Sequence, residues 1–249
     1  MHILKTTLLL TMTFLSPAIS GSASEILSAA EQGNIEQVKA LLQENPRLIG
    51  VTDERGYTLL HKAAYNNRTE IADYLISQGA DINAVSNGGS TPLHGAAYGG
   101  HLETARLLLD HGAGIEIQNT GGFTPLLSAC AGGRIELVRL LISHGANVHV
   151  KGNSDWTALM YAVIGGNEDV VRLLMEKGVN VNARAANGET ALHRALWNDR
   201  KQMVELLVNN GADVDILTNQ GISLLYFAVA YRSSDISDLL IDKGTDFDI

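Results

Sequence analysis

One hydroxyl residue recurs every 33 residues along this chain of 249 residues. Threonine occupies the first five positions of the series and serine the sixth: Thr58, Thr91, Thr124, Thr157, Thr190 and Ser223. Glycine keeps the same interval at Gly79, Gly112, Gly145, Gly178, Gly211 and Gly244, so no insertion interrupts the series. Such a period is typical of solenoids, in which small units stack side by side. We therefore expect one continuous array rather than two globular domains.

Each unit reads as two short helices. A threonine can cap the first helix by accepting hydrogen bonds from the free N–H groups of its first turn, and Pro92 and Pro125 then occupy the first helical position. Glycine pairs such as Gly132-Gly133 predict a turn, and the second helix carries apolar residues at helical spacing, as in 137, 140 and 141. The periodic glycine then ends that helix in a left-handed conformation.

The core of each unit, in the form Thr91-Pro92-Leu93-His94 followed by Ala96-Ala97, resembles the ankyrin repeat. The resemblance covers roughly residues 25 to 249. It implies an all-α ankyrin-repeat solenoid of about seven helix-turn-helix units with β-hairpin fingers between them. Within residues 24–249 we predict an N-terminal capping repeat (24–52), five 33-residue repeats (53–217) and a C-terminal capping repeat (218–249). A loop one residue longer, near Pro46, separates the first unit from the next.

The first residues are typical of a secretory signal peptide. Lys5 precedes an apolar run from 8 to 15, Pro17 interrupts it, and small residues follow. Cleavage is expected after Ser20 or Ala23, which makes residues 1–23 the signal peptide and places the first repeat helix at about Glu25. The run is shorter than the roughly twenty apolar residues of a membrane anchor. We therefore predict a periplasmic or secreted protein without membrane insertion after cleavage.

The net charge and the positions of histidine and cysteine exclude several classes of function. The formal net charge of -9 and the absence of a clustered basic face argue against nucleic acid as a partner. His61, His94 and His193 share one slot but lie in different units, too far apart to ligate one metal ion; the resemblance implies a structural hydrogen-bonding role. Cys130 fills a slot that alanine fills elsewhere and is expected to be buried. No catalytic triad or phosphate loop is present, so we predict no enzyme, no cofactor and no metal.

Aromatic residues concentrate where the resemblance places the concave face and finger tips, which bind proteins in this family. Exposed aromatic side chains are frequent interface anchors, so the predicted protein-binding residues are Tyr57, Tyr65, Tyr98, Phe123, Trp156, Tyr161, Trp197, Phe227 and Tyr231. For Tyr57, Phe123 and Trp156 the alternative is packing between fingers, and for Phe227 and Tyr231 it is shielding of the last unit. Cations on the same side, Lys62, Lys151, Arg184 and Arg194, favour a partner with an acidic rim.

These features predict a monomeric, non-catalytic, exported module that binds another protein. Resemblance to exported bacterial ankyrin proteins suggests two roles, an immunity protein against a toxic effector or a helper of a periplasmic enzyme such as a catalase. The sequence leaves the partner, the organism and the choice between these roles open. The alternative is a small-ligand or haem carrier that uses His94 or His101, although a shallow groove lacks the enclosure of most small-molecule sites.

Overall fold

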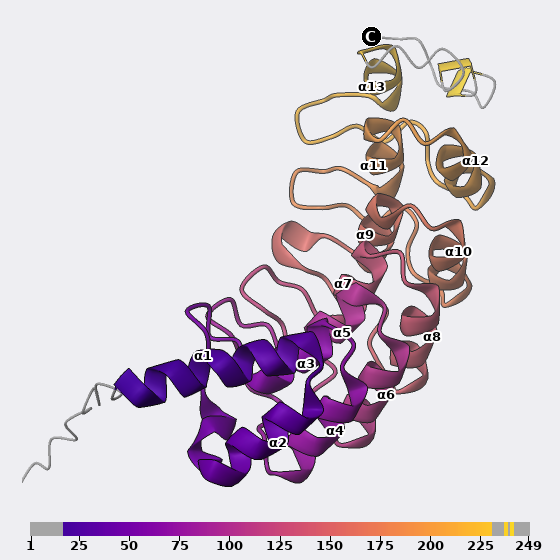
Figure 1. Ribbon diagram of the computed structural model, residues 1–249. Helices are drawn as coiled ribbons and strands as arrows, with labels where there is room; N and C mark the ends of the chain where they lie inside the picture. Colours follow the sequence, from indigo (N-terminus) through magenta and orange to yellow (C-terminus); the bar gives the residue numbers. More distant parts are fainter. Residues whose placement is uncertain (1–16, 231–236, 239, 242–249) are drawn as a thin grey trace, which may run out of the picture.

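The computed structural model describes residues 17–230, 237, 238, 240 and 241, which form a curved stack of helical hairpins (Figure 1). The helices that lie first in each unit are α1 (Pro17–Gln32), α3 (Leu59–Tyr65), α5 (Pro92–Gly99), α7 (Pro125–Ala131), α9 (Ala158–Gly165), α11 (Ala191–Trp197) and α13 (Leu224–Ala230). The second helices are α2 (Ile35–Glu44), α4 (Thr69–Ser77), α6 (Leu102–Asp110), α8 (Ile135–Ser143), α10 (Glu168–Glu176) and α12 (Lys201–Asn209).

The all-helical prediction is confirmed, and the described residues give six complete helix pairs followed by α13. The second half of the predicted C-terminal capping repeat falls largely outside the described residues. Near Pro46 the extra residue of the first connection is accommodated by a short 3-10 helix, η1 (Pro46–Gly50). A second one, η2 (Asn153–Asp155), lies at the tip of a later loop.

The capping threonines set the start of the inner helices. Thr124 accepts a hydrogen bond from the N–H of Leu127 at 3.3 Å, and Pro125 occupies the first helical position. The next turn carries Ala129 and Cys130, both fully buried. Because these side chains are small, α7 contacts α5 on one side and α9 on the other. The same arrangement recurs through the stack and makes the inner helices a continuous row.

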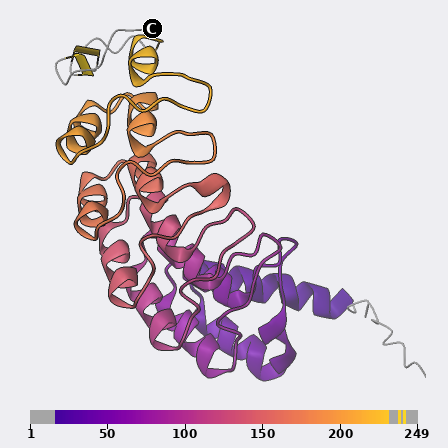
Figure 2. The ribbon, with the colours of Figure 1, turned by 180° about the vertical axis from the view of Figure 1, so that it is seen from behind.

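The outer helices form a second row on the convex side of the curve (Figures 1 and 2). Their inward faces carry leucine and valine that are buried against the inner row, as with Leu137, Val138 and Leu141 in α8. Each unit thus contacts mainly its neighbours, and a single elongated core runs the length of the stack. Among the helices of the described residues we find none with the length and hydrophobicity to span a bilayer.

The loops between units differ from the expected β-hairpins. In the described residues the only β-type pairings outside helices are two isolated bridges, Thr52 with Thr58 and Lys151 with Thr157. Each loop closes through a bond such as Asn119 N–H to Phe123 C=O at 2.9 Å. Most successive loops are joined by one backbone bond, as from Thr120 N–H to Gly88 C=O at 2.9 Å. Single bonds of this kind hold the loops in a row on the concave side without forming a strand ladder in the described residues, so the predicted β-hairpin fingers are not confirmed.

The first helix begins earlier than predicted. α1 starts at Pro17 instead of about Glu25, so both predicted cleavage positions, after Ser20 and after Ala23, lie within it. Its inner part packs on α2 and α3, and its N-terminal end projects beyond the stack (Figure 1). The apolar run at residues 8–15 lies outside the described residues, and the signal peptide stays a prediction.

Candidate functional site

Histidines in the slot after the cap link successive units. Nδ1 of His61 and of His94 accepts a hydrogen bond from the backbone N–H of the capping threonine, at 3.2 and 3.1 Å. The proton therefore lies on Nε2, which donates to a backbone oxygen of the next loop. These oxygens belong to Ser90, at 2.7 Å from His61, and Phe123, at 2.8 Å from His94. Both ring nitrogens of each histidine are engaged within the chain.

The same histidines are kept neutral by their surroundings. Burial lowers the pKa of His61 and His94 below the usual value, and the hydrogen bonds to Ser90 and Phe123 only partly offset it. The pKa of His193 falls to about 4, chiefly through burial and then through Arg184 and Arg194. At neutral pH the three imidazoles therefore carry no charge toward a partner.

The structure gives little support to chemistry at this face. In the described part of the chain, no three histidine, cysteine or acidic side chains gather in a way that could hold a metal ion. Cys130 is buried, and burial raises the pKa of its thiol to about 12, so the thiolate that reactivity needs is scarce. His101, the other histidine considered for a haem ligand, contacts Tyr65 C=O through Nε2 at 2.8 Å. His94 and His101 thus both use Nε2 within the fold.

Three of the predicted binding residues are more than half exposed. Tyr65 and Tyr98, at the ends of α3 and α5, have exposed fractions of 57% and 54%, and Trp197 at the end of α11 has 51%. They occupy equivalent positions, seven residues after the capping threonine and at or near the ends of the inner helices. Large exposed aromatic side chains of this kind are the ones that alanine scanning most often finds at interfaces.

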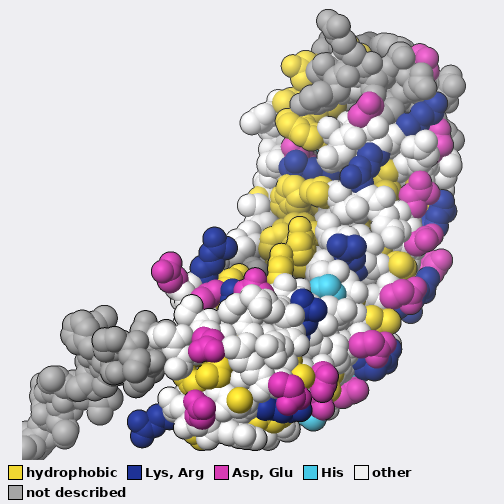
Figure 3. Space-filling model, in the orientation of Figure 1, with side chains coloured by type: hydrophobic (Ala, Val, Ile, Leu, Met, Phe, Trp, Pro, Cys, Tyr) yellow, Lys and Arg dark blue, Asp and Glu magenta, His cyan; other side chains and the backbone are white. Residues whose placement is uncertain are grey.

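Three others, those before the capping residue, pack partly against neighbours. Tyr57, Phe123 and Trp156 are half-buried. The Phe123 ring lies 4.7 Å from that of Tyr161, and the Trp156 ring lies 5.4 Å from it. These three residues contact neighbouring side chains and are partly exposed, which is compatible both with packing between loops and with binding a partner. Figure 3 shows hydrophobic side chains gathered along the middle of the stack.

The expectation of exposed rings is wrong for two residues. Tyr161 is only 8% exposed because Phe123 and Trp156 cover its ring. Phe227 is 7% exposed and packs edge-on against His193, with centroids 5.7 Å apart. Both belong to the core, and the alternative of shielding fits Phe227. Tyr231 lies outside the described residues.

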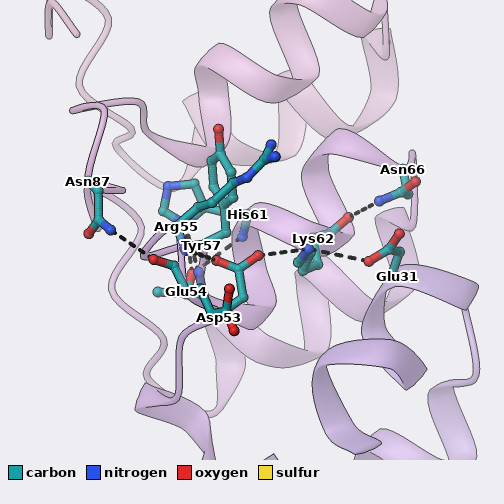
Figure 4. Close-up of polar contacts among 10 residues, drawn as sticks. Glu31, Asp53, Glu54, Arg55, Tyr57, His61, Lys62, Asn66 and Asn87 are labelled. Carbon is teal, nitrogen blue, oxygen red and sulfur yellow. Dashed lines mark hydrogen bonds and ion pairs between the residues drawn. The ribbon is translucent and has the colours of Figure 1, made fainter. Parts of the chain in front are cut away.

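The predicted cations are mostly neutralised within the chain. Lys62 lies between Asp53, at 2.9 Å, and Glu31, at 3.3 Å (Figure 4). Burial opposes the charge of Lys62, but these two carboxylates outweigh it and raise the lysine pKa. Lys151 pairs with Asp155 and Arg194 pairs with Glu189, whereas Arg184 donates to the neutral side chain of Asn219 and keeps its charge. The argument for an acidic partner rim therefore loses its basis at Lys62, Lys151 and Arg194.

A groove of about 570 Å³ occupies the N-terminal half of the concave face. The helix-end residues Tyr65 and Tyr98 line it together with Tyr57 and Phe123 from the loops. Gly95 of α5 also lines it. Sequence reasoning did not predict this groove, although one signal existed: the slot four residues after the cap holds glycine here and a larger side chain in most other units.

Tyr226 is 62% exposed, although it was not among the binding residues predicted from the sequence. It follows Ser223 by three residues, a slot that the linking histidines occupy in other units. Those histidines are buried because a further unit packs over them.

Comparison with known proteins identifies the repeat. A family model described as "Ankyrin repeats (3 copies)" matches residues 26–120, 112–185 and 179–249. Among curated proteins, "Ankyrin repeat domain-containing protein 49" from Homo sapiens is 43% identical over 61 residues, covering 24% of this chain and 26% of the relative. "Palmitoyltransferase akr1" from Schizosaccharomyces pombe is 42% identical over 57 residues, covering 23% of this chain and 9% of the relative.

These matches cover only a small part of each relative. The chain spans about a quarter or less of the length of these curated relatives. The name of the second relative describes an activity of that protein, and this chain covers 9% of its length. What the likeness supports is the repeat itself, a module that is generally non-catalytic and generally binds other proteins.

Proposed function

Because the chain belongs to the ankyrin repeat family, we propose that it is a non-catalytic, exported module that binds a partner protein through its concave face and loop tips. The exposure of Tyr65, Tyr98 and Trp197 on one side of the stack carries this proposal. Monomeric immunity proteins and helpers of periplasmic enzymes both need such a surface, and either role is compatible with it. A haem carrier has less support, since His94 and His101 use Nε2 elsewhere.

Export is supported by the positive start, apolar run and small residues of 1–23. Expression of the full chain with secretion intact should give a mature form that begins after Ser20 or Ala23. Mass spectrometry of the periplasmic and culture fractions measures this directly. Recovery of the chain only in the cytosol with its first residues retained would contradict export while leaving the binding proposal intact.

Replacing Tyr65, Tyr98 and Trp197 together by alanine should abolish capture of the partner. Interface anchors cost about 2 kcal/mol or more each on truncation, so their joint loss should weaken binding by more than about 100-fold. Capture from the exported fraction, followed by titration of the identified protein, measures the effect. Circular dichroism should show an unchanged helix content because these side chains are largely exposed.

Arg106, Arg139 and Arg172, which are exposed on the outer helices α6, α8 and α10, provide a matched control. Their joint replacement by alanine should leave capture intact. If the aromatic triple variant binds as well as the parent, the binding site lies elsewhere on the molecule. Equal loss in both triple variants would indicate a general defect in the protein.

A further inference from the structure

The groove arises from a gap in a row of side chains. The fourth residue after each cap is Lys62, Gly95, Ser128, Tyr161, Arg194 or Phe227. Lys62, Gly95 and Ser128 line the groove, whereas Tyr161 and Phe227 are covered by neighbouring rings. Several of the larger ones pack on an aromatic ring that precedes a cap. Lys62 lies 5.9 Å from the centre of the Tyr57 ring, and Arg194 lies 4.2 Å from the centre of Trp156. Gly95 supplies no such side chain.

The space left by Gly95 is bounded by rings on two sides. Tyr65 and Tyr98 stand at the helix ends, and Tyr57 and Phe123 stand at the bases of the loops. A Cβ atom added at Gly95 would lie 3.4 Å from the Cβ of Tyr65, which is ordinary contact. Its φ is not in the left-handed region, so nothing in the local backbone demands glycine there. The missing side chain is therefore what keeps the groove open.

The charges that line the groove define what fits. Two carboxylates, Asp53 and Glu31, flank the single ammonium of Lys62, and His61 and His94, which also line the groove, are neutral. Arg55 also lines the groove, and the described residues provide no carboxylate partner for its guanidinium (Figure 4). An uncharged planar group suits the ring-lined part, and a carboxylate suits the side of Arg55.

We propose that the groove receives an aromatic side chain from a loop of the partner protein, with a carboxylate of the same loop bound to Arg55. The inserted ring would pack between the tyrosines as Tyr161 packs between Phe123 and Trp156 in the same row. A protein loop fits better than a free small molecule because Tyr65 and Tyr98 are more than half exposed, whereas small-molecule sites bury most of their ligand. This inference rests on the proposed function and specifies its partner.

A disulfide-closed library of random loops, selected on the full chain, tests the proposal. Selected loops should share an aromatic residue with an aspartate or glutamate beside it. Their affinity should fall by about 30-fold or more for Gly95→Phe, which fills the groove from within. Arg55→Ala should remove the preference for the carboxylate, measured as equal affinity for a loop and its Asp→Asn or Glu→Gln version.

Arg106→Phe places the same ring on the outer helix α6 and should leave loop binding unchanged. A thermal melt of Gly95→Phe at or above the parent would show that its loss of binding is local. Loops without an aromatic residue, undiminished binding to Gly95→Phe, or N-acetyltryptophan amide binding as tightly as the loops would each overturn the proposal. Gly95→Phe could capture the natural partner while the aromatic triple variant does not. That result would contradict insertion of a ring into the groove but support the proposed binding of a partner protein.

Discussion

Leu141→Ala should lower the free energy of unfolding by about 2–5 kcal/mol. Leu141 is fully buried in α8, where the outer helix meets the inner row, and removing its side chain leaves a cavity inside the array. Each unit is held mainly by its neighbours, so a defect in a central unit weakens both adjoining interfaces. Urea unfolding followed by circular dichroism measures the change as a shift in midpoint.

Leu217 provides the control because it is 47% exposed in a loop. Leu217→Ala should change stability by no more than about 0.5 kcal/mol, as is usual for surface positions. An unfolding midpoint for Leu141→Ala equal to that of the parent would contradict the stacked core. A change of slope with an unchanged midpoint would instead point to loss of cooperativity along the array.

The second large effect is expected for His94→Ala, which should destabilise the protein by about 2–4 kcal/mol. The substitution leaves the N–H of Thr91 and the C=O of Phe123 without their imidazole partner in a buried site, and each unsatisfied group costs about 1–3 kcal/mol. Because Phe123 belongs to the next unit, the interface between α5 and α7 should open first. Hydrogen exchange of the amides in α7 would report this local change.

His111→Ala is the matched control, since this exposed histidine follows α6 and bears no inter-unit bond in the described residues. It should leave both stability and exchange unchanged. If His94→Ala proves as stable as His111→Ala, the imidazole is dispensable and the linking role is wrong. Faster exchange in every helix alike would show that the effect is global instead of confined to one interface.

The contact of the histidines with the cap depends on local spacing, whereas the bonds of His61 and His94 to the next unit depend on how the units stack. A histidine three residues after a threonine cap returns to the cap whatever the rest of the chain does, and His61, His94 and His193 all do so. The exposure of the aromatic side chains is harder to predict from the sequence. Tyr65 and Tyr161 both lie on inner helices, yet one is exposed and the other is covered by Phe123 and Trp156. Exposure depends on which side chains the adjacent units bring, and periodicity does not encode it.

The period, the helix pairs and the caps follow from residues close together in the chain, and the unbroken period indicates one stacked array. Other features come from the stacking of the units: the described loops form no strand ladder, Lys62 lies between Glu31 and Asp53, and Gly95 leaves a groove between tyrosines. Those features join residues of different units. Their geometry is fixed by the angle and spacing at which the units stack, and small changes in either would open or close every contact between them.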